Sequence, residues 1–236
     1  MKERKVFYGW WVVVGIVINL SLLGPAAVAI ANLFQTAVTT EFGISNSAFA
    51  INNVLVLGIG IFISPIVSRL LSGDKFKLTY LAGVLSYIIG LVGYSFSQNI
   101  YNFYFFSLFL GTGFITSTII PASILINNWF IDKRGLALSI ALSGLGIGGF
   151  ILSPLVTALI SSLEWRMTYQ IYAGLIAVLV IPTSLFLIRF KPEDMELVAL
   201  ESENIDETAT NSSSQVDSGK VRLTVSQSLK KPFSSY

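Results

Sequence analysis

Six apolar stretches, with basic residues only between alternate ones, constrain this chain more than any other feature of its sequence. The stretches cover about residues 8–36, 47–71, 78–97, 102–128, 135–161 and 167–190. Basic residues precede the first stretch, follow the second and fourth, and follow the sixth, so fourteen of the fifteen Lys and Arg fall on one side and only Arg166 on the other. Cytoplasmic loops of membrane proteins are enriched in Lys and Arg. The pattern therefore predicts a multi-pass membrane protein with both termini in the cytoplasm.

The composition also favours a membrane protein over a soluble fold. Hydrophobic residues make up 53% and charged residues 12% of the 236 residues, whereas a soluble domain has about 25% charged residues. A spanning helix needs roughly 20 apolar residues, so six spans and a tail account for the length. We predict an all-α integral membrane fold with six transmembrane helices in the cell membrane. The lipid bilayer surrounds the predicted bundle, and nothing in the sequence indicates a nucleic-acid partner.

The predicted organisation has three parts. They are a cytoplasmic N-terminus (1–7), a transmembrane bundle (8–190) and a flexible, acidic cytoplasmic linker (191–236). Residues 192–219 carry eight acids and no base, a composition typical of a flexible segment. Gly24-Pro25 lies inside the first span and predicts a kink, and the backbone groups that a kink frees need protein or water partners.

Ionisable chemistry is scarce in the predicted spans. The chain has no Cys and no His, which removes thiol chemistry and the commonest metal ligand. Ionisable side chains inside a membrane usually mark proton relays or sites for charged solutes, and the span interiors hold none. There is also no nucleophile–base set, paired carboxylate or metal cluster. We therefore expect neither an enzyme nor a bound cofactor or metal.

Neutral polar side chains remain as candidates for a solute pathway. In the fourth span, Thr112, Thr116 and Ser123 fall, together with Asn127, in a narrow arc at 100° per residue. Polar stripes on several helices predict a water-filled path or a binding cavity. The alternative is hydrogen bonding between helices, worth about 0.6 kcal/mol for each bond. The candidates are Asn32, Gln35, Thr112, Thr116, Ser123 and Ser143.

Small residues in the fourth and fifth spans predict close approach of helices. The residues assigned to helix packing are Gly111, Gly113, Gly144, Gly146, Gly148 and Pro154. The run 144–149 also matches the GxGxxG pattern of dinucleotide sites. Such a site needs a strand before the pattern and a helix that opens after it. This run lies inside an apolar span instead, so packing is the better interpretation.

Several motifs together resemble one family of membrane transporters. The segment NNWFIDKRGLALSIALSGLGIGGFILSPL (127–155) resembles the fourth loop and fifth helix of major facilitator transporters, in the branch of oxalate–formate antiporters and monocarboxylate porters. YGWWVV (8–13), EWR (164–166) and FKPEDMEL (190–197) are also similar to that branch. The resemblance covers essentially residues 7–236.

The resemblance implies a twelve-helix fold of two six-helix halves, each an inverted pair of three-helix repeats, with the solute between the halves. This chain would be the N-terminal half, with repeats at about 8–97 and 102–190, ending before helix seven, and the C-terminal half would be its partner. The implied function is transport of a small solute, an organic anion such as a monocarboxylate or dicarboxylate, by alternating access as a secondary transporter. A non-transporting membrane sensor or interaction protein, or an inactive truncation product, remain the alternatives.

The resemblance also assigns two cytoplasmic gate loops. In the family the loop between helices two and three reads roughly G-x-L-x-D-R-x-G-R-R, and SRLLSGDKFK (68–77) departs from it. In this chain the resemblance assigns the gating role to Asp74 and Lys75. In the next cytoplasmic loop it assigns this role to Asp132, Lys133 and Arg134. The basic residues that bind carboxylates in oxalate–formate antiporters lie in the C-terminal half, outside this chain.

Overall fold

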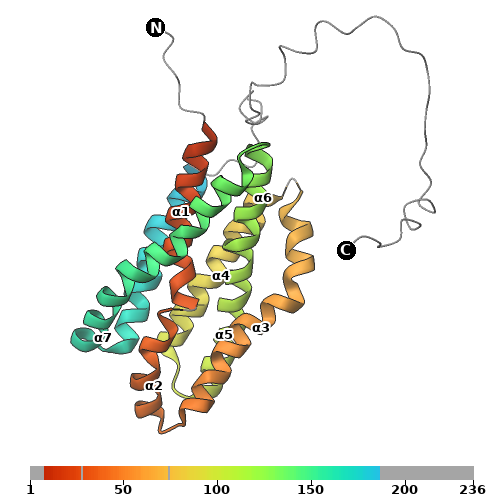
Figure 1. Ribbon diagram of the computed structural model, residues 1–236. Helices are drawn as coiled ribbons and strands as arrows, with labels where there is room; N and C mark the ends of the chain where they lie inside the picture. The colour runs from red at the N-terminus through yellow and green to blue at the C-terminus, as the bar shows by residue number, and fades with distance from the viewer. Residues whose placement is uncertain (1–7, 28, 74, 187–236) are drawn as a thin grey trace, which may run out of the picture. The chain divides into compact units, whose positions relative to one another are not determined.

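Six membrane crossings follow one another in the computed structural model, which describes residues 8–27, 29–73 and 75–186. The predicted N-terminus (1–7), the linker (191–236) and Asp74 lie outside the described residues. The first crossing combines α1, η1 and α2, the fourth combines α5 and α6, and α7 supplies the last two (Figure 1). The elements are α1 (Tyr8–Ala27), η1 (Ala31–Phe34), α2 (Gln35–Phe42), α3 (Asn46–Leu71), α4 (Phe76–Phe96), α5 (Ile100–Ser117), α6 (Ile119–Trp129) and α7 (Arg134–Phe186).

The length of α7 shows that it crosses a membrane twice. It has 53 residues, which at 1.5 Å per residue would extend about 80 Å if straight, against a hydrocarbon core of about 30 Å. Glu164 interrupts it with φ 68° and ψ 159°, a backbone conformation that is rare outside glycine. The segments 134–163 and 165–186 therefore form the fifth and sixth spans, and the predicted all-α bundle of six transmembrane helices is confirmed.

Two of the six spans are broken rather than continuous. The first leaves α-helical geometry after Ala27 and resumes as η1 at Ala31, close to the kink predicted at Gly24-Pro25. The N–H of Ile30 donates to the carbonyl of Pro25 at 2.7 Å across this break. The fourth span breaks at Thr118, where φ is −114° and ψ is −104°. These breaks interrupt the regular phase of side chains along both spans.

Side-chain caps begin two of the helices. The side chain of Ser45 accepts a hydrogen bond from the N–H of Ala48 at 3.2 Å, and that of Asn99 accepts one from Asn102 at 2.9 Å. Such caps satisfy backbone N–H groups that have no partner within the helix. Both starts lie at the end of the bundle opposite the start of α1.

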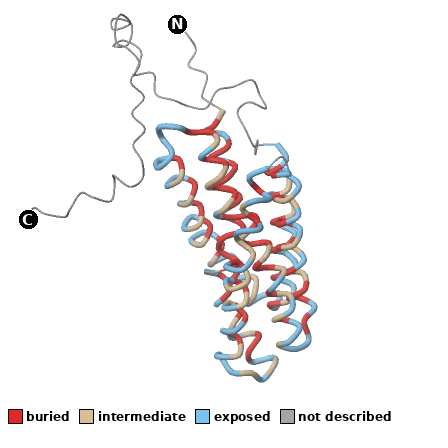
Figure 2. The backbone as a smooth tube through the Cα atoms, turned by 90° about the vertical axis from the view of Figure 1, so that its right-hand side faces the viewer, coloured by how far each residue is buried: buried red, intermediate tan, exposed pale blue. Residues whose placement is uncertain are grey.

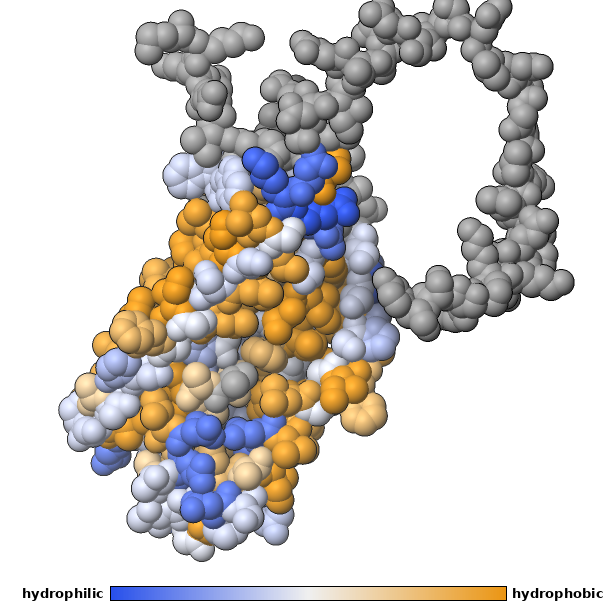
Figure 3. Space-filling model, viewed as in Figure 1, coloured by the Kyte–Doolittle hydropathy of each residue, from blue (hydrophilic) through white to orange (hydrophobic). Residues whose placement is uncertain are grey.

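The buried residues run along the interior of the bundle (Figure 2). Helix α1 packs along α7, and α4 packs against both α5 and α7. Large apolar side chains also cover the outside of the bundle, and apolar residues dominate the middle of the face in Figure 3. Phe62 and Phe150 are 80% and 83% exposed. In water such a surface would mark an interface. On six spans of this length it is the surface that contacts lipid.

The charged residues occupy the two ends of the bundle. The described basic residues at the end where α1 begins are Arg69, Lys75, Lys77, Lys133 and Arg134, and Arg166 lies at the opposite end. This separation is the arrangement predicted from the alternation of the loops. The two ends of the bundle therefore differ in charge, and labelling from one side of the membrane can measure which end faces that side.

We expect Gln98→Cys, between α4 and α5, to react with a membrane-impermeant maleimide added outside intact cells, because the positive-inside rule directs this loop outward. Gly73→Cys, between α3 and α4, should react only after permeabilisation. The chain has no native Cys, so each variant reports one position. Labelling of Gly73→Cys alone in intact cells would contradict the proposed orientation.

Candidate functional site

The break in the first span presents Asn32 on the surface of the bundle. Asn32 lies in η1 and is exposed. The Nδ2 group of Asn53, from α3, donates to the Oδ1 atom of Asn32 at 3.3 Å. The Oδ1 atom of Asn53 is buried and has no hydrogen-bond partner among the described residues. Irregular backbone at membrane depth persists only where protein buries it or water reaches it, so this face of the break is the best candidate for contact with a solute.

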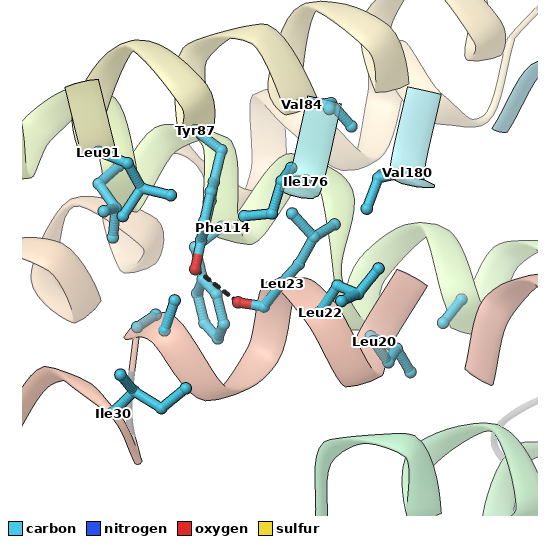
Figure 4. Close-up of a cluster of buried hydrophobic side chains, with 14 of the residues drawn as sticks. Leu20, Leu22, Leu23, Ile30, Val84, Tyr87, Leu91, Phe114, Ile176 and Val180 are labelled. Atoms are coloured by element: carbon cyan, nitrogen blue, oxygen red, sulfur yellow. Dashed lines mark hydrogen bonds between the residues drawn. The ribbon is translucent and has the colours of Figure 1, made fainter. Parts of the chain in front are cut away.

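Two tyrosine hydroxyls hold the last turns of α1 before the break. Tyr87 of α4 donates to the carbonyl oxygen of Leu23 at 2.5 Å, as Figure 4 shows, and Tyr172 of α7 donates to that of Leu22 at 2.6 Å. Both tyrosines are buried. These tyrosines lie inside the bundle, whereas Asn32 is exposed on its surface. The break therefore has a packed side and a polar side.

The break at Thr118 divides the predicted arc on the fourth span, with Thr112 and Thr116 before it and Ser123 and Asn127 after it. Thr112 is half-buried, but Thr116 is only 5% exposed. Thr116 donates to the carbonyl of Thr112 at 2.7 Å and packs directly on Gly83 of α4. Beyond the break, Asn127 is exposed. Thr116 is therefore part of the α4–α5 contact.

Among the remaining pathway candidates, Gln35 is joined to Asn32 through its backbone N–H, which donates to the carbonyl of Asn32. Gln35 is half-buried at the start of α2. The hydroxyl of Ser123 donates to the carbonyl of Ile119 at 3.0 Å, and that of Ser143 to Ile140 at 2.7 Å. These serines satisfy their hydroxyls on their own helices. The structure thus brings the side chain of Asn32 together with that of Asn53, and the described side-chain hydrogen bonds do not join it to the other candidates.

The packing residues divide into close contacts and open positions. A Cβ atom on Gly148 would lie 1.9 Å from the carbonyl oxygen of Ser21, and one on Gly144 would lie 2.6 Å from that of Val17, so α1 and α7 touch backbone to backbone. Gly111 meets α3 and Gly113 meets α4 in the same way, with backbone atoms at 2.3 Å and 2.4 Å.

Two packing candidates lack such contacts. No heavy atom of another element lies within 4 Å of where a Cβ on Gly146 would be, and Pro154 is exposed on α7. The side of α7 that meets α1 contains Gly144 and Gly148, one helical turn apart. Gly146 lies between them, about 200° around the helix from each at 100° per residue, and faces away.

The described gate residues lie together at the end of the bundle where α1 begins. Lys75 caps the start of α4 and is exposed, as are Asp132 and Lys133 between α6 and α7. Arg134 begins α7, and its Nε atom donates to the carbonyl of Phe130 at 2.6 Å. The bond holds Arg134 against the end of the fourth span.

A charged cluster that the sequence analysis missed joins three helix ends on the opposite side. Glu41 of α2 accepts hydrogen bonds from the Nε1 atom of Trp165, at 2.5 Å, and from Arg166. Arg166 also donates to the carbonyl of Ser97 at 2.9 Å, and its guanidinium lies 4.2 Å from the Trp165 ring centre. Arg166 was the one base on this side of the predicted spans. Its need for an acidic partner, with Glu41 and Glu164 as the nearby outer acids, was the signal that could have found this cluster.

Two neutral clusters inside the bundle were also missed. Asn19 donates to the hydroxyl of Tyr80 at 3.0 Å and accepts from Thr183 at 2.7 Å, joining α1, α4 and α7. Tyr94 donates to the Oδ1 atom of Asn52 at 2.8 Å, and the Ser107 hydroxyl bonds the same atom. These hydrogen bonds stabilise the contacts between the helices.

Electrostatically, the interior of the described bundle is neutral. Every Asp, Glu, Lys and Arg of residues 8–27, 29–73 and 75–186 lies at a helix end or in a loop. A solute that crosses the described part meets amides, hydroxyls and backbone groups. These groups bind by hydrogen bonding and supply no full charge.

The chain was compared with known proteins. The sequence model of the Major Facilitator Superfamily matches residues 9–232. Monocarboxylate transporter 12-B of Danio rerio is 28% identical over 72% of this chain and 35% of that protein. Monocarboxylate transporter 12 of Homo sapiens is 26% identical over 72% of the chain and 33% of that protein, and monocarboxylate transporter 1 of Mus musculus is 26% identical over 89% and 42%.

These matches agree with the geometry of the bundle. The chain spans about a third of the length of the first relatives. The match to the family covers nearly all of the chain, including all six described crossings, the broken first span and the glycine contacts of the fifth. The chain with this neutral, membrane-spanning bundle of six helices therefore belongs to the major facilitator superfamily.

Proposed function

We propose that this chain forms one half of the pathway of a secondary transporter that moves a small organic anion, a monocarboxylate, by alternating access. The observation that carries the proposal is the broken first span, which presents Asn32 on the surface of the bundle and supports it with Asn53. The names of the relatives, which are monocarboxylate transporters, support the class of solute.

The chemistry of Asn32 suits a carboxylate. Its Oδ1 atom accepts from Asn53, so its Nδ2 group can donate to a solute oxygen. A carboxylate only accepts hydrogen bonds, and bonds to a charged partner contribute about 1.5–3 kcal/mol each. Asn32 would thus orient the carboxylate without neutralising it.

A neutral half-site requires a second bundle to supply the opposing charge. The described part offers no interior base, and the relatives are about three times as long as the matched region. We propose that the partner is a second bundle of six spans. Within this chain the first three and last three spans, about 8–97 and 102–190, would be inverted repeats, and Asp74, Lys75, Asp132, Lys133 and Arg134 would line the cytoplasmic gate at the plasma membrane.

Protection of an introduced thiol tests the solute and the site together. Ala29 is exposed within the break, so Ala29→Cys, in the chain assembled with the proposed second bundle, should react with a soluble maleimide, and lactate should slow the reaction. Asn32→Leu in the same background should raise the half-protecting lactate concentration at least about tenfold, because a hydrogen bond to a charged group is lost.

Two controls sharpen this test. Lactamide has nearly the same shape as lactate but no charge, and it should not protect. Gln98→Cys, exposed in the loop between α4 and α5, should react at a rate that lactate does not change. Equal protection by lactamide and lactate would show that the site does not select an anion.

A further inference from the structure

A span broken in the middle of a membrane needs support from its neighbours. In the first span α1 ends at Ala27 and η1 begins at Ala31, and α2 beyond it has only eight residues. An isolated helix of that length is unstable, since even good helix formers need roughly 12–15 residues. The position of Asn32 therefore depends on what holds the two sides of the break.

Before the break, two helices contact consecutive carbonyl groups of α1. Tyr87 reaches Leu23 from α4 (Figure 4), and Tyr172 reaches Leu22 from α7. Tyr87 is fully buried and Tyr172 is 4% exposed. A tyrosine hydroxyl buried in this way has no water to bond, so its hydrogen bond fixes the ring and the carbonyl relative to each other.

Beyond the break, the same face of α7 continues the contact. The ring of Tyr169 stacks on Phe34 of η1, with ring centres 3.8 Å apart and planes 13° apart. One turn earlier, Trp165 bonds Glu41 at the end of α2. Residues three or four apart share one face of a helix, so Trp165, Tyr169 and Tyr172 follow the first span across its break.

We propose that Tyr87 and Tyr172 are positioning residues for the solute site, because their hydroxyls fix the end of α1 and so determine where the break presents Asn32. This inference rests on the proposed function of Asn32. The second half of α7 contacts the first span on both sides of the break and so supports it, and Tyr87 of α4 holds the end of α1 from another side. Neither tyrosine contacts the solute.

Removing one hydroxyl at a time tests this role. Tyr87→Phe and Tyr172→Phe keep the ring and lose the hydrogen bond. In the Ala29→Cys background, each should raise the maleimide reaction rate about fivefold and the half-protecting lactate concentration about fivefold, the factor that corresponds to one hydrogen bond of about 1 kcal/mol.

Tyr94→Phe is the matched control. Tyr94 lies on α4 two turns from Tyr87, is equally buried, and bonds Asn52 and Ser107 instead of the first span. Tyr94→Phe should lower the melting temperature as much as the other two variants and leave both thiol measurements unchanged. If the substitutions acted only through a general loss of stability, both thiol measurements would change alike in all three variants. That result would overturn the proposal.

The two thiol measurements also separate this proposal from the proposed function. If lactate protects none of the proteins but Tyr87→Phe and Tyr172→Phe still react faster, the two tyrosine hydroxyls support the break and the solute assignment is wrong. If lactate protects the parent protein but neither variant changes the rate or the protection, the tyrosines are not positioning residues. If one variant does not fold, the other gives the same decision.

Discussion

Gly148→Ala is expected to lower the free energy of unfolding of the bundle by about 3 kcal/mol, the upper end for an overpacked core. The added Cβ would lie 1.9 Å from the carbonyl oxygen of Ser21 and 2.6 Å from its Cα atom. Backbone atoms cannot rotate away as a side chain can, so α1 and α7 must separate. Helices in membranes associate largely through close packing. Thermal unfolding of the purified protein in detergent measures the loss.

Gly146→Ala is the control two residues away on the same helix. No neighbouring atom lies within 4 Å of its added Cβ, and alanine favours a helix over glycine by about 1 kcal/mol. Gly146→Ala should therefore leave the melting temperature unchanged or raise it. A similar loss of stability in both variants would mean that α1 and α7 do not meet at Gly148.

Arg166→Met is expected to lower the free energy of unfolding by about 2 kcal/mol. The change removes the bonds to Glu41 and to the carbonyl of Ser97, together with the contact between the guanidinium and Trp165. Bonds to charged groups contribute about 1.5–3 kcal/mol each. The side chains of Arg166 and Glu41 are 32% and 42% exposed, so solvent screening reduces the sum.

Arg69→Met provides the comparison for Arg166. Arg69 is exposed in the last turn of α3, and a surface change of this kind usually alters stability by no more than about 0.5 kcal/mol. High salt should narrow the difference between the parent protein and Arg166→Met, because it screens the ion pair. Equal destabilisation by the two substitutions would show that the charged cluster does not hold the three helix ends together.

The candidate site was only partly predictable from the sequence. Asn32 was identified because it is polar within an apolar span, and the same criterion selected Thr116, which packs on Gly83. Sequence periodicity treats a span as one regular helix, but the break at Thr118 resets the direction of every side chain beyond it. Asn53 could not be assigned to the site, because its pairing with Asn32 depends on how two helices cross.

The sequence by itself determined that this chain crosses a membrane six times and which loops share a side. A bilayer leaves no water for backbone groups, so roughly 20 apolar residues must form a helix wherever they occur. The tertiary structure decided which polar groups are exposed and which are satisfied inside. Whether Glu41 meets Arg166, or Tyr172 meets Leu22, depends on contacts between segments more than 120 residues apart. No local pattern records such contacts, because they arise only when the helices pack.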